Sequence, residues 1–96
     1  MSATKKIKIF LVADDINFLK ALIKLLSKVG NKFMEIKVFP TGEKFLQNFQ
    51  YKPAILVMDY NLNQYSPNLI HAKEVVKIIK SLHPETEVIM LSSPKY

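Results

Sequence analysis

Four short segments of the chain have the hydrophobic pattern of β-strands. Residues 6–12 (KIKIFLV) and 54–58 (AILVM) are mostly apolar, which is typical of strands that are buried on both faces of a sheet. Residues 34–39 (MEIKVF) alternate apolar and charged side chains, which predicts an edge strand with one solvated face. Residues 88–91 (VIML) predict a fourth strand.

The segments between these strands have the spacing of amphipathic helices. In residues 17–29 apolar side chains recur at i, i+3, i+4 and i+7, while lysines lie four residues apart on another face. Asn17 predicts the N-cap of this helix and Gly30 its end. Residues 43–50 predict a shorter helix after a Pro-Thr-Gly turn, and residues 72–80 repeat the long amphipathic spacing.

Strands and helices alternate as βαβαβαβ, which predicts an α/β fold with a parallel sheet and helical crossovers. The alternating second strand belongs at an edge and the two apolar strands belong inside, so we expect the spatial order 2-1-3-4. Right-handed crossovers then put the first helix on one face and the other two helices on the opposite face. Such a flavodoxin-like open sheet binds ligands beyond the C-terminal ends of its strands, where the strand order reverses.

Composition narrows the function classes. A chain of 96 residues is long enough for one domain, so we expect residues 1–96 to form a single domain. The chain has no cysteine, and its first apolar run is too short for a signal peptide or a membrane span, which predicts a cytoplasmic protein. The net charge of +6 comes from lysines alone, without arginine. These lysines have the spacing of solvated helix faces, and arginine is the residue that best forms bidentate hydrogen bonds with phosphates and bases. We therefore do not expect nucleic-acid binding.

All three aspartates of the chain follow the two apolar strands. Asp14 and Asp15 come after IFLVA, and Asp59 comes directly after AILVM. Carboxylates gathered at adjacent strand ends repel one another unless a cation neutralises them, and an oxygen-only cluster favours Mg²⁺. Asp59 is then a candidate phosphoryl acceptor, and Ser92 could hydrogen-bond a phosphoryl oxygen. An Asp after a strand is also a common turn or helix cap, so Asp15 could instead serve the first helix.

Three motifs resemble the receiver domain of bacterial two-component response regulators. They are FLVADD at 10–15, VMDYN at 57–61 and VIMLS at 88–92, and the Thr-Gly-Glu at 41–43 is similar to that family's turn into its second helix. The resemblance covers nearly the whole chain. It implies a receiver-type fold that is truncated after the fourth strand, without the family's last strand and helices. The family's lysine at the end of the fifth strand is therefore missing, and Lys95 does not simply replace it.

The resemblance also implies a role for each candidate site residue. Asp59 would accept a phosphoryl group from a histidine kinase or phosphotransfer protein, in phosphorelay signalling rather than as an enzyme. Asp15, Asp59 and the backbone carbonyl of Asn61 would ligate Mg²⁺, and Asp14 would act through water. Ser92 would contact the phosphoryl group.

Two other functions are considered. A haloacid-dehalogenase-like phosphatase needs a second Asp two residues after its nucleophile, and that position is Asn61 here, which argues against this class. A non-phosphorylated receiver-fold interaction module is the serious alternative, because the lysine is missing and the loop after Asp59 is longer than the family's, without its Met-Pro.

We also expect a homo-oligomer. A single helix, residues 17–29, has to cover one whole face of a four-stranded sheet that is apolar on both sides. The fourth strand, residues 88–91, is an apolar edge, and such edges tend to pair with other chains.

Overall fold

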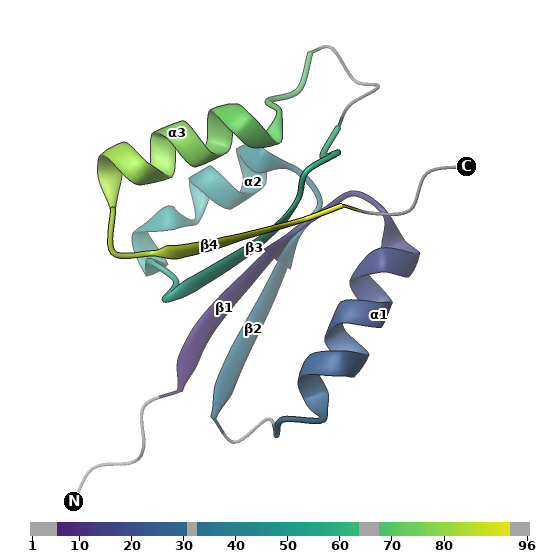
Figure 1. Cartoon of the computed structure of the whole chain (residues 1–96). Coiled ribbons are helices and arrows are strands. Elements are labelled where there is room, and N and C mark those ends of the chain that lie inside the picture. Colours follow the sequence, from purple (N-terminus) through teal and green to yellow (C-terminus); the bar gives the residue numbers. More distant parts are fainter. Residues whose placement is uncertain (1–5, 31–32, 64–67, 93–96) are drawn as a thin grey trace, which may run out of the picture.

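Parallel strands form the central layer of the molecule, and helices lie on both sides of it (Figure 1). The structure, a computed structural model, describes residues 6–30, 33–63 and 68–92. Its elements in chain order are β1 (Ile7–Val12), α1 (Ile16–Ser27), β2 (Met34–Phe39), α2 (Gly42–Gln47), the 3-10 helix η1 (Phe49–Tyr51), β3 (Ile55–Asp59), α3 (Ala72–Leu82) and β4 (Glu87–Leu91). The strands are all parallel and lie in the order β2-β1-β3-β4, which confirms the predicted fold class and strand order.

β1 and β3 are the inner strands, as their apolar sequences predict. Val12 near the end of β1 pairs with Phe39 of β2 on one side and with Met58 of β3 on the other. Each inner strand has a strand on both sides and hydrophobic clusters on both faces, so a polar side chain in its middle would be buried without water. β2, which carries the alternating charges, is at an edge as predicted.

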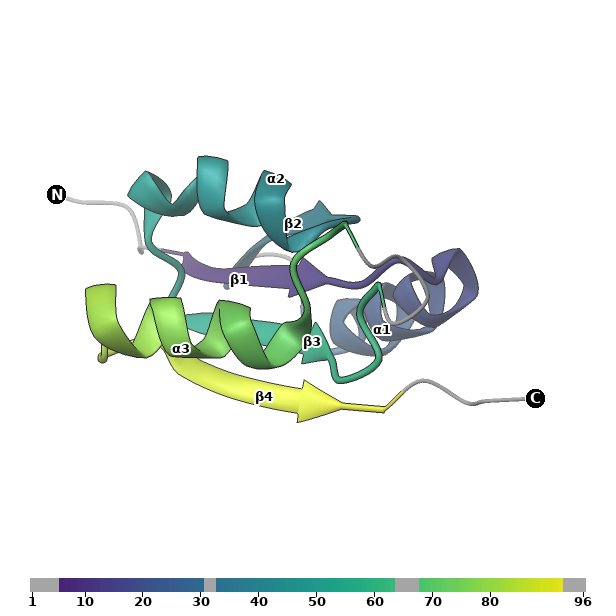
Figure 2. The ribbon, with the colours of Figure 1, turned by 90° about the horizontal axis from the view of Figure 1, so that it is seen from above.

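The larger hydrophobic core lies between the sheet and the helices α2 and α3, which Figure 2 shows side by side on one face. Phenylalanines from β1, β2, α2 and η1 pack in one cluster, with the centroids of contacting rings 5.1–6.0 Å apart: Phe10, Phe39, Phe45 and Phe49. α3 contributes the buried side chains of the predicted apolar stripe, Ala72, Val75 and Ile79. These aromatic and aliphatic groups belong to the larger of the two hydrophobic clusters among the described residues.

Gly42 lets α2 come close to α3 and to the segment before it. A Cβ at this first residue of α2 would lie 2.5 Å from Cγ2 of Ile70 and 2.7 Å from Cγ2 of Val75. No ordinary side chain fits at those distances without a shift of its neighbours. The Pro-Thr-Gly turn therefore supplies both the N-cap, Thr41, and the one residue type that the packing allows there.

Among the described elements, α1 is the one helix that covers the opposite face of the sheet, as the handedness of the crossovers predicts. Ile9, Leu11 and Val57 pack against Leu19 of α1 and its partly buried neighbours. The cover is incomplete, since side chains of the edge strands on this face remain exposed: Val38 of β2 (38%) and Ile89 of β4 (46%). The described helices include none with the length and apolar character that a bilayer crossing needs.

The start of α1 differs from the prediction. Asp15, not Asn17, is the N-cap, with φ −94° and ψ 111°, and its Oδ1 accepts hydrogen bonds from the backbone N–H groups of Asn17 and Phe18. Both residues are good caps, but a carboxylate also interacts favourably with the positive end of the helix dipole. The helix also ends earlier, at Ser27, before Gly30, which has φ +115°.

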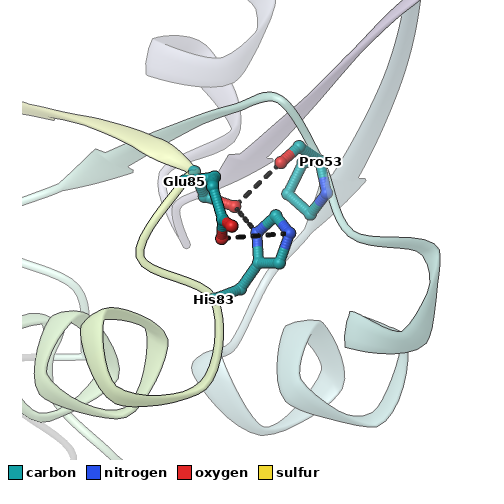
Figure 3. A network of polar contacts seen from close by, with 4 residues as sticks. Pro53, His83 and Glu85 are labelled. Atoms are coloured by element: carbon teal, nitrogen blue, oxygen red, sulfur yellow. Dashed lines mark hydrogen bonds and ion pairs between the residues drawn. The ribbon is translucent and has the colours of Figure 1, made fainter.

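The buried hydroxyl of Thr86 joins the turn between α3 and β4 to the loop that precedes β3 (Figure 3). Thr86 Oγ1 donates to the Pro53 carbonyl at 2.9 Å and lies 2.7 Å from Nδ1 of His83. A hydroxyl has one hydrogen and a carbonyl only accepts, so Nδ1 of His83 must carry the hydrogen that it shares with Thr86. The contact of His83 Nε2 with Glu85 Oε1, at 3.7 Å, is then attractive when the ring is protonated.

We predict that Thr86→Val destabilises the fold by about 1–3 kcal/mol, because it leaves the Pro53 carbonyl and His83 Nδ1 without their shared partner. Thr86→Ser is the matched control, since it keeps the hydroxyl and removes only a methyl group. Urea unfolding followed by circular dichroism measures both variants. A larger loss in Thr86→Ser than in Thr86→Val would mean that the methyl packing, and not the hydrogen bonds, stabilises this turn.

Candidate functional site

The C-terminal ends of β1, β3 and β4 lie next to one another at one end of the sheet (Figure 2). Val12 of β1 pairs with Met58 of β3, and Asp59 pairs with Leu91 of β4. Asp14 therefore follows two residues after the paired end of β1, and Ser92 follows directly after the strand residue that faces Asp59. The topology brings the predicted site residues to the same end of the sheet, although they are far apart in sequence.

Asp59 is the last residue of β3 and is almost completely buried, with 1% of its surface exposed. The alternation of side chains along β3 puts it on the α1 face, with Val57 and Ile55. Its Oδ1 accepts a hydrogen bond of 2.9 Å from the backbone N–H of Asn61. The buried carboxylate thus shapes the first turn of the following loop.

The two aspartates after β1 lie in different environments. Asp15 is half-buried and caps α1, while the exposed Asp14 accepts a hydrogen bond from the backbone N–H of Asn63 through Oδ2, at 3.3 Å. This contact joins the loop after β1 to the loop after β3. Asn63 has a positive φ of 54° and is buried, with only 3% of its surface exposed.

Ser92 is exposed and follows β4. The backbone N–H of Tyr60 donates to the carbonyl of Leu91 at 2.6 Å, so the ladder between β3 and β4 continues one step past Asp59. The residue after Asp59 and the residue before Ser92 are therefore directly linked. Lys95 lies outside the described residues.

Two contacts that the sequence did not predict tie the loop after β3 to the rest of the structure. Besides the bond from Asn63 to Asp14, Oε2 of Glu43 in α2 accepts the backbone N–H of Ile70 at 2.7 Å. Oε1 of Glu43 and Nδ2 of Asn63 are buried and have no hydrogen-bond partner among the described residues. The signal in the sequence was weak: Asn tolerates a positive φ, and Glu43 follows the Thr-Gly turn.

The carboxylates of the candidate site are oxygen ligands of the kind that hard cations prefer, but they do not form a tight cluster. In the described ranges, no three His, Cys, Asp or Glu side chains lie close enough together to hold a metal ion. The ligand set expected for Mg²⁺ needs only two carboxylates, Asp15 and Asp59, with the Asn61 carbonyl and waters. Both cap bonds of Asp15 use Oδ1, so its Oδ2 can still serve a cation. The donor types fit Mg²⁺.

Solved structures with the same fold include receiver domains. The chain is 20% identical to a response regulator receiver domain protein from Clostridium thermocellum, with a TM-score of 0.72 over 90% of this chain and 64% of that one. The chemotaxis response regulator CheY4 of Vibrio cholerae is 20% identical, with a TM-score of 0.73 over 96% and 72% of the two chains. The N-terminal domain of an uncharacterized protein from Wolinella succinogenes is 23% identical, with a TM-score of 0.70 over 94% and 67%.

The chain therefore has the fold of response-regulator receiver domains, which confirms the predicted resemblance at the level of the fold. It spans less than two thirds of the Clostridium thermocellum structure. No family model matches the sequence, and no curated protein matches it significantly. At these identities the likeness concerns the arrangement of strands and helices, and the roles of individual residues have to be argued from the site itself.

We predict that Asp15→Ala lowers the free energy of unfolding by about 1 kcal/mol, because it removes the N-cap of α1. Asp15→Asn is the matched variant, since its side-chain oxygen can still accept the N–H groups of Asn17 and Phe18. Its loss of stability should be a few tenths of that of Asp15→Ala. If urea unfolding shows the two variants to be equally destabilised, the negative charge and not the cap geometry is what α1 requires.

Proposed function

We propose that this chain is a receiver-type signalling domain that accepts a phosphoryl group on Asp59 from a histidine kinase or phosphotransfer protein. The observation that carries the proposal is the position of Asp59, a buried carboxylate at the end of an inner strand. On either side of it lie the strand ends that carry Asp14 and Asp15 and Ser92. The proposed role is non-enzymatic and cytoplasmic, with residues 1–96 acting as one domain.

The proposed reaction transfers a phosphoryl group between two side chains. The phosphorus–nitrogen bond of a phosphohistidine breaks, its electron pair stays on the imidazole, and a carboxylate oxygen of Asp59 forms the new bond to phosphorus. Mg²⁺, when bound, neutralises the charge of the phosphoryl oxygens. Asp15, Asp59 and the Asn61 carbonyl would hold the ion, with Asp14 acting through water, and the Ser92 hydroxyl would donate to a phosphoryl oxygen.

We predict that a small phosphodonor such as acetyl phosphate, with Mg²⁺, adds one phosphoryl group to the wild-type chain. The adduct should be sensitive to hydroxylamine, as acyl phosphates are, and absent from Asp59→Asn. Glu85→Gln is the control, since Glu85 is an exposed carboxylate in the turn before β4. Intact-protein mass spectrometry measures the yield. An adduct that persists in Asp59→Asn would overturn the assignment.

The second candidate function is a receiver-fold interaction module that is never phosphorylated. It is favoured by the hydrogen bonds that two of the carboxylates already make within the chain. Oδ1 of Asp15 caps α1, and Asp14 binds the backbone of Asn63. In such a module the aspartates would keep their structural roles, and a partner protein would recognise the surface without chemistry at Asp59. The two functions differ in whether the acidic residues bind a cation.

We predict that Mn²⁺, as a paramagnetic substitute for Mg²⁺, binds weakly and saturably to the wild type. Water-proton relaxation enhancement should fall at least several-fold in Asp15→Asn, which keeps the helix cap and removes the charge of one ligand. Glu85→Gln should match the wild type. Equal enhancement in the wild type and Asp15→Asn would remove Asp15 from the metal site, and no saturable response in any variant would favour the interaction module.

A further inference from the structure

Two lysines and an exposed tyrosine meet on the face of the sheet that carries α2 and α3. Lys8 lies near the start of β1, Lys37 lies in β2, and Tyr51 ends η1. The ammonium group of Lys37 lies 4.6 Å from the centroid of the Tyr51 ring, and that of Lys8 lies 5.8 Å from it. Both distances are in the range of a cation–π contact, and the tyrosine is 47% exposed. We call these three residues the lysine–tyrosine surface.

The register of the sheet puts both lysine side chains on the same face. Lys37 pairs with Phe10 of β1, which lies two residues after Lys8. Because side chains alternate along a strand, both lysines are on the face where Phe10 joins the core under α2 and α3. Lys8 Nζ also donates a hydrogen bond of 3.3 Å to the Tyr51 carbonyl. The position of two ammonium groups at one aromatic ring therefore follows from the fold.

The positive charge of this surface is not balanced within the described chain. Among the described residues, no lysine forms an ion pair with a carboxylate. Lys52, which follows Tyr51 in the chain, is a further exposed lysine. Glu35 is the register partner of Lys8 and lies on the same face, without an ion pair to it. The surface is thus positive, with a single negative group on one side.

The backbone at Lys52 is strained. Its φ of 34° and ψ of 91° lie in a region that residues with a side chain rarely adopt. The turn is held on both sides, since the N–H of Lys52 donates to the Phe49 carbonyl at 2.8 Å and the Pro53 carbonyl accepts from the Thr86 hydroxyl. Strain of this kind is concentrated at functional sites. It is a second, independent feature of the chain next to the exposed tyrosine.

We propose that the lysine–tyrosine surface binds an acidic segment of a partner protein, in which carboxylates flank an apolar side chain. The carboxylates would pair with the ammonium groups of Lys8 and Lys37, and the apolar side chain would pack on the exposed part of the Tyr51 ring. Tyr51 precedes β3, whereas Asp59 ends it. The proposed binding is therefore separate from the candidate site and does not depend on phosphoryl transfer.

A protein segment fits this surface better than a nucleic acid does. A nucleic acid carries a negative charge at every nucleotide, and Glu35 would repel the phosphates that lie next to Lys8. The chain also has no arginine for bidentate contacts with phosphates. A peptide can place its carboxylates only where the ammonium groups lie. Exposed charge pairs are weak and screened by salt, so we expect a dissociation constant on the order of 100 micromolar at low ionic strength.

Fluorescence anisotropy tests the proposal on the intact chain, with a short peptide in which glutamates flank single leucines and which carries a neutral dye. At low salt the double variant Lys8→Gln/Lys37→Gln should bind the peptide about fivefold more weakly than the wild type. Lys20→Gln/Lys24→Gln is the matched control, because it removes the same charge from exposed positions of α1. Its affinity should stay within about twofold of that of the wild type. Lys8→Arg/Lys37→Arg keeps both charges and should retain the binding.

Two-dimensional NMR spectra locate the bound peptide, and the largest amide shifts should be those of Tyr51, Lys52 and their neighbours in β2. Equal weakening in the two glutamine double variants would show that net charge alone attracts the peptide, which overturns the proposal. A wild type without saturable binding well above the expected dissociation constant also overturns it. So does a single-stranded oligonucleotide of the same charge that binds the wild type more tightly than the peptide does and is weakened by Lys8→Gln/Lys37→Gln.

Discussion

The parallel pairing of β1 with β3 is the constraint on which the rest of the structure depends. Both strands have neighbours on each side and helices above and below, so their interiors admit only apolar side chains. Because they run in the same direction, both leave the core at the same edge of the sheet. Asp59, the last residue of β3, and Asp14, which follows β1, are therefore brought to the same end of the sheet by the topology, although they are far apart in the sequence.

The same pairing makes the two faces unequal. The crossover from β1 to β2 leads to one side, and the crossovers from β2 to β3 and from β3 to β4 lead to the other, as right-handed connections require. Four phenylalanines and the α3 stripe fill the face with two helices, while α1 is the one described helix on the opposite face. Ile89 of β4, on the face that α1 covers, is 46% exposed.

Most of the fold could be predicted because its signals are local. The alternation in 34–39 marks an edge strand, and the unbroken apolar runs mark the inner strands, so the order β2-β1-β3-β4 follows from pattern and handedness. The helix cap was predicted wrongly because Asp15 and Asn17 are both good caps two residues apart. The choice between them depends on how the chain leaves β1, which no local pattern records.

The site was predictable only in part, for the same reason. Strand topology predicts that the aspartates lie at the same end of the sheet, but the direction of each side chain depends on backbone groups that are distant in the sequence. Asp14 binds the N–H of Asn63, 49 residues away, and Glu43 binds that of Ile70, 27 residues away. Such contacts have no sequence signature, and they determine whether the carboxylates face a ligand or their own loops.

Beryllofluoride, a stable mimic of a phosphoryl group on a carboxylate, tests the role of Asp59 most directly. Fluorine NMR of the chain with Mg²⁺ and beryllofluoride should show a protein-bound signal, together with amide shifts at the residues that follow β1, β3 and β4. Asp59→Asn should lose both. A spectrum with only free beryllofluoride, or a bound signal that survives in Asp59→Asn, would contradict the proposal that Asp59 accepts the phosphoryl group.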